Sequence, residues 1–236
     1  PIASQMSVMR SSLIGSLLQV VKFNADHKAD RVRVFELGRV FLRNAAVQST
    51  DTTVEGFDQP MRVAGMAWGP VEPLGWQGKA RNVDFYDVKA DVEKLLAPRK
   101  PEFVAAEHPA LHPGQTALIE RDGKPVGHLG AIHPELAKAL GLDRPVFLFE
   151  LVLGDVVEGR LPKFSELSKF PETRRDLALI AGRDVASSAV LELIRDNAGE
   201  WLTDLRLFDV YQGKGIDPDR KSLAVGLTWQ HPSRTL

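Results

Sequence analysis

Two adjacent arginines precede an apolar segment and have the chemistry to bind an anionic partner. The stretch Phe170–Ala181 reads FPETRRDLALIA, so Arg174 and Arg175 stand where a predicted buried strand begins. A guanidinium in that place is solvated, paired with an acid, or used on a partner such as a phosphate group. We therefore consider a nucleic-acid contact here, beside the simpler interpretation of an ordinary solvated surface.

Further basic residues in the same half of the chain extend this hypothesis. Lys214 lies in the turn-rich loop QGKGIDPD, where the motif Gly213-Lys214-Gly215 is too short to be a phosphate-binding loop and predicts a turn. Basic and acidic residues are equal in number from Lys163 to Arg234, so RNA binding there requires a local patch. The candidate members of that patch are Lys169, Arg174, Arg175, Lys214, Arg220 and Lys221.

The sequence gives weaker evidence for a metal site or a catalytic site. His108 and His112 have the spacing of zinc ligands on a helix, but Pro109 and Pro113 exclude a regular helix there. No carboxylate accompanies them at metalloprotease spacing, and no Ser/His/Asp grouping stands out. We expect turn residues at strand ends, with neither a metal site nor a catalytic residue in this chain.

The composition limits the class of protein. A chain of 236 residues with a net charge of −1 suits one large or two small domains. It has no cysteine, which excludes a disulfide framework and a thiolate metal site and fits a reducing cytoplasm. No apolar run approaches the roughly 18 residues of a membrane span. The chain opens within a continuing pattern at Pro1, so we interpret it as a fragment of something longer.

The first part, residues 1–160, predicts an α+β domain with an antiparallel sheet. Helical periodicity marks Ser11–Val21, with Ser7 or Ser11 as candidate caps, and Asp84–Ala97. The turn Arg121-Asp122-Gly123 predicts a hairpin. The predicted strands are Arg31–Phe41 with a bulge at Gly38, Met61–Trp68, Phe103–Glu107, Gln115–Glu120, Lys124–Ile132 and Val146–Leu153, with a loop over Asn44–Pro60 and a helix over Pro134–Leu140.

The last part, residues 170–236, follows a connector over residues 161–169 and predicts the order β-α-β-β. Those are the first four elements of a ferredoxin-like β-α-β-β-α-β unit, here truncated before its last helix and strand. The first strand would then lie on an open edge. In the strand Lys221–Trp229, alternate residues from Leu223 would face the helix, leaving Ala224, Gly226 and Thr228 on an open face.

Ordered motifs along the chain resemble the beta subunit of phenylalanyl-tRNA synthetase. In the first part they are Met9–Leu13, Phe35–Phe41, Asp84–Lys89, His112–Gln115 and Gly127–Pro134. In the second part they are Phe170-Pro171 with Arg174–Ala178, Leu207–Gly213, Lys221–Ala224 and Arg234–Leu236. These motifs span nearly the whole chain and follow the same order as in the family. They resemble the C-terminal portion of the family's sequence.

This resemblance implies a class II synthetase-like core followed by an anticodon-binding domain. It implies an alpha2-beta2 enzyme of the cytoplasm that charges tRNA-Phe with ATP and Mg, and in which the alpha subunit performs catalysis. Leu42 stands where an active class II enzyme would place a substrate-binding arginine, and Arg43 comes one residue late. The chain would then scaffold the alpha subunit and contact the anticodon.

An open ferredoxin-like sheet binds single-stranded RNA by stacking and by edge contacts. The expected tRNA-binding residues are Lys169, Arg174, Arg175, Tyr211, Lys214, Lys221 and Thr228. Two alternatives stay open. One is a stand-alone enzyme with a site around Arg39, His112 and His133, and the other is a purely structural interaction module.

Overall fold

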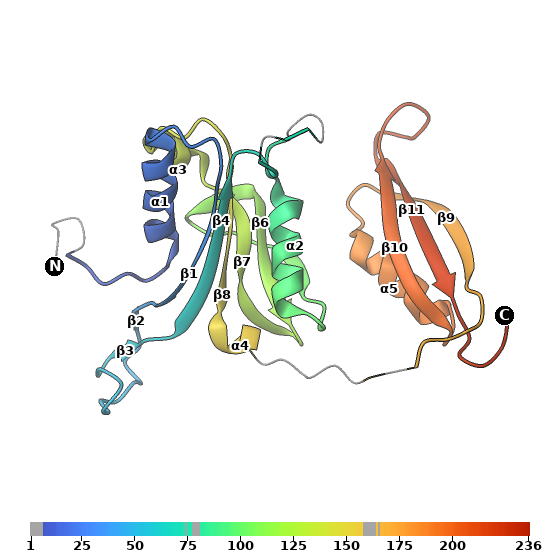
Figure 1. Ribbon diagram of the computed structural model, residues 1–236, viewed down its shortest axis with the longest axis horizontal. Helices are drawn as coiled ribbons and strands as arrows, with labels where there is room; N and C mark the ends of the chain where they lie inside the picture. Colours follow the sequence, from blue (N-terminus) through green and yellow to red (C-terminus); the bar gives the residue numbers. More distant parts are fainter. Residues whose placement is uncertain (1–6, 74, 77–80, 158–163, 165) are drawn as a thin grey trace. The chain divides into compact units, whose positions relative to one another are not determined.

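The computed structural model describes residues 7–73, 75–76, 81–157, 164 and 166–236, and the chain forms two compact units, Pro1–Leu161 and Pro162–Leu236. Figure 1 labels the helices and strands of both units. The elements of the first unit are α1 (Ile14–Asp26), β1 (Val32–Arg39), β2 (Leu42–Arg43), β3 (Phe57–Asp58), β4 (Met61–Trp68), α2 (Phe85–Leu96), β5 (Glu102–Ala105), β6 (Leu111–Arg121), β7 (Lys124–Ile132), α3 (Pro134–Ala139), β8 (Val146–Val152) and α4 (Leu153–Val157).

A six-stranded antiparallel sheet forms the centre of the first unit, in the order β1-β4-β8-β7-β6-β5. Alternate residues of its central strands enter two separate cores. Met66 and Leu148 pack with α1, whereas Ala67 and Phe149 pack with α2. The sheet is therefore covered by helices on both faces, with α1 and α3 on one side and α2 on the other (Figure 1).

Local sequence explains where α2 begins. The side chain of Asp84 accepts hydrogen bonds from the backbone N–H groups of Tyr86 and Asp87 at 2.8 and 3.1 Å. The carboxylate of Asp87 in turn accepts from the N–H of Asp84 at 2.9 Å. This reciprocal capping box satisfies backbone donors that the first turn leaves free, and it fixes the helix start that the sequence predicted at Asp84.

The start of α1 differs from the prediction. Neither Ser7 nor Ser11 caps the helix; the hydroxyl of Ser12 accepts from the N–H of Ile14 at 3.1 Å. The buried carboxylate of Glu150, on β8, accepts from the N–H of Leu13 at 2.6 Å. The helix therefore begins where a strand distant in sequence supplies an acceptor.

Three other local predictions were wrong. Strand β1 has no bulge at Gly38, which pairs in register with Arg62 of β4. A Cβ at residue 38 would overlap the guanidinium of Arg10, so the glycine provides room for that side chain. The segment Asn44–Pro60 contains the short strand β3, which pairs with β2, and the apolar strand β8 ends one residue early and leads into the helix α4.

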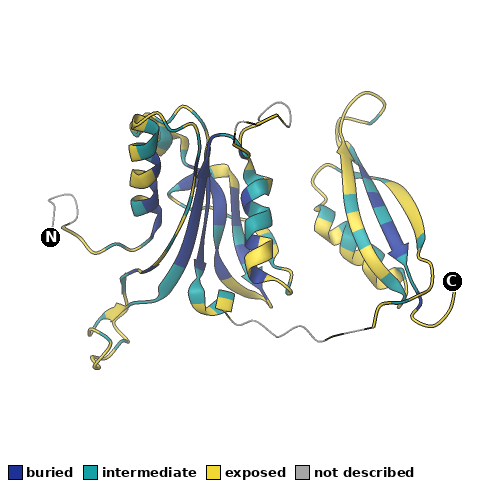
Figure 2. Cartoon of the chain, viewed as in Figure 1, coloured by how far each residue is buried: buried dark blue, intermediate teal, exposed yellow. Residues whose placement is uncertain are grey.

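The second unit consists of β9 (Thr173–Gly182), α5 (Ser187–Asn197), β10 (Leu202–Tyr211) and β11 (Arg220–Trp229) in its described residues. The predicted order β-α-β-β is confirmed, and the antiparallel sheet has the order β10-β11-β9. Strand β9 lies at an edge, as predicted. The central strand β11 holds the buried residues of this sheet, whereas β9 and β10 are largely exposed (Figure 2).

The alternation predicted for β11 is also confirmed. Leu223, Val225 and Leu227 are buried. The indole N–H of Trp229 donates to the carbonyl of Ala198, the residue that ends α5, at 2.8 Å. This set therefore faces the helix, and the intervening residues face away from it.

Candidate nucleic-acid interface

The face of the second sheet turned away from α5 carries charged residues in two cross-strand rows; we call it the open face. In one row, Thr228 of β11 lies between Arg174 of β9 and Asp204 of β10. In the next row, Gly226 lies between Asp176 and Arg206. The two rows have opposite charge order, so positive and negative groups alternate around a centre that is free of large side chains.

A groove of about 380 Å³ lies over these rows. Its lining residues, which define the charged groove, are Arg174, Asp176, Asp204, Arg206, Phe208, Gly226, Leu227 and Thr228. At Gly226 an added Cβ would lie 3.4 Å from the Asp176 carboxylate and 3.7 Å from the Phe208 ring. The glycine therefore keeps the floor of the groove open between a carboxylate and an aromatic ring.

Of the seven predicted RNA-binding residues, the charged groove brings together two. The exposed Arg174 lines its edge, and its Nε lies 4.0 Å from the carboxylate of Glu172. Thr228 also lines the groove and is only 6% exposed. These two residues come from neighbouring strands in direct register.

Two more predicted residues meet at the opposite end of the sheet. Tyr211 pairs with Ser222 and so shares the open face. Its hydroxyl donates to the carbonyl of Lys214 at 3.2 Å, and its ring lies close to Gly213. The side chain of Lys214 is exposed in the loop, and Lys169 is exposed in the segment before β9.

The remaining two predicted residues belong to the other face. Arg175 is in register with Leu227, and Lys221 follows the same alternation as Leu223, so both lie on the α5 side. The ammonium of Lys221 donates to the carbonyl of Arg183 at 3.0 Å. The two neighbouring arginines that first indicated a nucleic-acid contact therefore point to opposite faces of the sheet.

Sequence reasoning missed four residues of the charged groove: Asp176, Asp204, Arg206 and Phe208. The signal was present in β10, where the polar or aromatic residues Asp204, Arg206 and Phe208 alternate with Leu205 and Leu207. Period-two alternation of this kind marks a strand with one exposed face.

The residues of the alternative enzyme hypothesis bond to nearby backbone. Arg39 donates to the carbonyl of Gln59 at 2.9 Å. His112 Nδ1 accepts from the N–H of Gly114 at 2.9 Å, and His133 Nδ1 accepts from the N–H of Glu135 at 3.3 Å, at the start of α3. Each has a local structural role, and in the described part of the chain no hydrogen bond or ion pair links the three.

A second polar group lies on the α1 side of the first sheet. The buried Glu150 accepts from Arg62 at 3.2 Å and from the hydroxyl of Ser12 at 3.0 Å. The rings of His108 and His128 lie beside each other, with centroids 5.1 Å apart. Burial lowers the pKa of both histidines, so they favour the neutral form.

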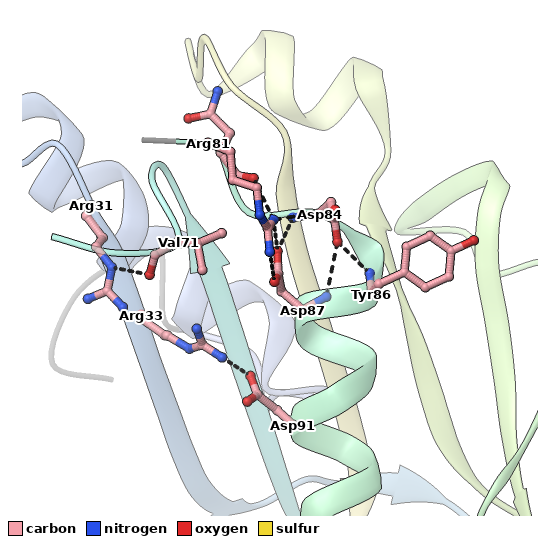
Figure 3. Close-up of polar contacts among 9 residues, drawn as sticks. Arg31, Arg33, Val71, Arg81, Asp84, Tyr86, Asp87 and Asp91 are labelled. Carbon is pink, nitrogen blue, oxygen red and sulfur yellow. Dashed lines mark hydrogen bonds and ion pairs between the residues drawn. The ribbon is translucent and has the colours of Figure 1, made fainter. Parts of the chain in front are cut away.

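An ion pair between β1 and α2 lies at an apolar cavity of about 520 Å³. Figure 3 shows Arg33 of β1 reaching Asp91 of α2, and Arg81 reaching Asp87 in the first turn of α2. The hydrogen bond from Arg81 holds the pKa of Asp87 below its ordinary value. The pair of Arg33 with Asp91 joins α2 to the edge strand β1, and the pair of Arg81 with Asp87 lies at the start of α2.

The described residues contain no cluster of three or more metal-ligating His, Asp or Glu side chains. Within the same part of the chain, every helix is too short or too polar to cross a lipid bilayer. The charged groove is lined by Arg174, Asp176, Asp204 and Arg206, whereas the charged residues at the apolar cavity are Arg33, Asp91 and Lys94.

Two family models match this chain. Residues 1–153 match the model described as the phenylalanyl tRNA synthetase beta chain CLM domain. Residues 168–236 match the model of the ferredoxin-fold anticodon binding domain. The second match covers the three strands of the sheet that carries the charged groove, together with α5.

Curated relatives give the same result. The chain is 71% identical to the phenylalanine–tRNA ligase beta subunit of Pseudomonas putida, and 62% and 45% identical to those of Pseudomonas fluorescens and Hahella chejuensis. Each similarity covers 100% of this chain and 29% of the relative, so the chain spans less than a third of the length of these relatives.

Proposed function

The chain belongs to the phenylalanyl-tRNA synthetase beta chain family, and from this premise we propose that it acts as part of a phenylalanine–tRNA ligase beta subunit. In this role it scaffolds the catalytic alpha subunit and contacts the anticodon of tRNA-Phe during ATP-dependent aminoacylation. The observation that carries the proposal is the open face, a sheet surface with arginines, an aromatic ring and small central residues in the part that matches an anticodon-binding model.

Residues 1–160 would form a class II synthetase-like core without catalytic residues, residues 161–169 a linker, and residues 170–236 the anticodon-binding domain. The lack of catalysis is supported by Leu42, which packs against the α1 core where an active class II enzyme would use an arginine, while Arg43 is exposed. ATP and Mg would belong to the alpha subunit of an alpha2-beta2 enzyme in the cytoplasm, with no cofactor in this chain.

RNA contact would begin with the phosphate backbone. Arg174, Lys214 and Lys169 are exposed cations, and each that meets a phosphate releases counterions and makes the affinity depend on salt. Tyr211 and Thr228 on the open face would contact bases. Arg175 and Lys221 lie on the α5 side, so their part in binding would be at the edge of the sheet.

Filter binding of tRNA-Phe by the complete chain over a salt series tests this proposal. We expect binding that weakens as salt rises and that weakens further when Arg174 or Lys214 is replaced by Ala. Absence of salt-dependent binding by the unmutated chain would favour the purely structural module. Charging of tRNA by the chain without an alpha subunit would instead support the stand-alone enzyme.

A further inference from the structure

Strand β1, at the edge of the first sheet, combines an open backbone edge, an adjoining apolar cavity and an excess of positive charge. We propose that β1 binds an extended segment of a partner protein as an added strand. This segment covers the cavity with apolar side chains and carries acidic side chains beside them. The inference goes beyond the proposed function, because it concerns the first unit and requires no RNA.

The backbone of β1 is open along its outer side. The strand is the first in the order β1-β4-β8-β7-β6-β5, and β4 is its one strand neighbour among the described residues. The carbonyl of Arg39 accepts from Nε of Arg10 at 3.0 Å. In the described part of the chain, no loop backbone or side chain bonds to the main chain of residues 32–38. An extended peptide satisfies such an edge by pairing with it as a further strand.

The apolar cavity of about 520 Å³ lies against the α2 side of this edge. Its lining includes Phe35 and Leu37 of β1, which are 73% and 53% exposed, and Leu95 of α2. Gly65 of β4 pairs with both Phe35 and Phe149, and an added Cβ at Gly65 would lie 2.4 Å from the Phe149 ring. The floor beside β1 is therefore aromatic. A strand added at β1 would place its own side chains against Phe35 and Leu37 and bury them.

The acidic residues at this edge are already paired. Asp91 of α2 pairs with Arg33 (Figure 3), and Glu36 of β1 pairs with Arg10. Both pairs are formed within the first unit. An incoming segment therefore meets acids that are neutralised by neighbouring arginines.

Two cations remain at the same edge. Arg39 ends β1 and Lys94 lines the cavity, and both are exposed and form no ion pair among the described residues. A second copy paired antiparallel about Glu36 would oppose Arg39 to Arg33 and Glu36 to itself. Like charges directly opposite each other destabilise a strand pair. The charge of the edge therefore favours an acidic partner over a second copy of this chain.

Strand geometry gives the pattern of the partner. Alternate side chains of an added strand point to the α2 side. Two successive members of that set meet Phe35 and Leu37, and the next one meets Arg39. The partner segment thus has apolar residues at two alternate positions and an acid at the following alternate position.

The test measures the fluorescence anisotropy of a labelled peptide, TETVTVTET, mixed with the complete chain. In an extended strand its valines and glutamates share one face, whichever way the peptide runs. Three matched peptides each change one feature. One has its central backbone N–H groups methylated, one has serine for both valines, and one has lysine for both glutamates.

Chain variants locate the site. Phe35→Glu puts a carboxylate on the exposed face of β1, and Tyr86→Glu is its control, since Tyr86 is 74% exposed and lies outside the cavity lining. Lys94→Gln removes the cation of the lining, and Lys124→Gln is the control at an exposed lysine of the β6–β7 hairpin. Thermal melting shows whether each variant is folded. The comparison of peptides needs no change to the chain, so it decides the outcome even where a variant unfolds.

We expect saturable binding of the parent peptide and a loss of about tenfold or more for each of the three matched peptides. Phe35→Glu should weaken the parent peptide by a similar factor, and Tyr86→Glu should leave its affinity unchanged. Lys94→Gln should weaken it by about two- to fivefold, because the charge is exposed, and Lys124→Gln should not. Sedimentation should show that the chain alone does not dimerise through β1.

Lack of saturable binding by the parent peptide at about 1 mM would refute the proposal. Equal affinity for the methylated peptide would show that the cavity takes apolar groups without an added strand. Equal affinity for the lysine peptide would contradict the acidic character of the partner. A dimer of the chain that Phe35→Glu abolishes would replace the partner segment by a second copy.

Discussion

Replacing Gly226 by valine should weaken RNA binding while leaving the second unit folded. An added Cβ would stand in ordinary contact with Asp176 and Phe208, at 3.4 and 3.7 Å, and the two methyl groups of valine would fill the space above it. Stacking of one base on an aromatic ring contributes about 1–3 kcal/mol, so its loss should weaken binding by about 5- to 150-fold. Valine favours strands, and a glycine in a strand interior costs roughly 0.5–1 kcal/mol relative to Ala.

The assay is filter binding of tRNA-Phe at fixed salt together with thermal melting. Gly226→Ala adds one methyl group at the same place and should give a smaller loss of affinity. Gly154→Ala, where an added Cβ meets nothing within 4 Å, is the matched control in the first unit and should bind as the unmutated chain does. A folded Gly226→Val variant with unchanged affinity would show that RNA does not bind on the open face.

Three further predictions concern single groups. Arg174→Ala should weaken tRNA binding and reduce the slope of log affinity against log salt concentration by about 0.7–0.9. Arg175→Ala, on the α5 side, should change that slope less. Equal effects of the two substitutions in a salt titration would contradict the assignment of faces. Because burial lowers the pKa of His108 and His128, the free energy of unfolding should be greatest above about pH 6.5 and fall below it, towards the folded-state pKa. Urea unfolding at several pH values checks this, and replacing both by Gln should flatten the profile. Glu150→Ala should reduce the free energy of unfolding of the first unit by about 3–5 kcal/mol, because it leaves Arg62 without its partly buried counter-charge. Denaturant unfolding measures this loss, and a loss well under about 1 kcal/mol would contradict the prediction.

The elements that could be predicted are those whose signals are local. The apolar stripe and cap of α2 lie within one segment, and the predicted turn at Asp122-Gly123 has the positive φ angles of 53° and 73° that join β6 to β7. The order β-α-β-β in the second unit likewise followed from periodicity and turn residues. In each case the residues that determine the structure are neighbours in the chain.

The parts that were missed depend on contacts between distant segments. The start of α1 is fixed by Glu150, which is 137 residues away from Leu13 in sequence. The charged groove requires the register of three strands and the bulge at Phe208, and neither is visible in the sequence of one strand. The sequence predicted that the adjacent Arg174 and Arg175 belong to one patch. Because successive side chains of a strand point to opposite faces of the sheet, the two arginines lie on opposite faces.

The central claim is that the second unit contacts the anticodon of tRNA-Phe through its open face. The most direct measurement is competition for labelled tRNA-Phe, bound to the complete chain, by two unlabelled hairpins of equal length. One hairpin carries the anticodon stem and loop, and the other carries the acceptor stem closed by an unrelated loop. We predict that the anticodon hairpin displaces the tRNA from the unmutated chain and binds the Gly226→Val variant about 5- to 150-fold more weakly. Equal competition by both hairpins, or displacement by the acceptor hairpin alone, would contradict the claim.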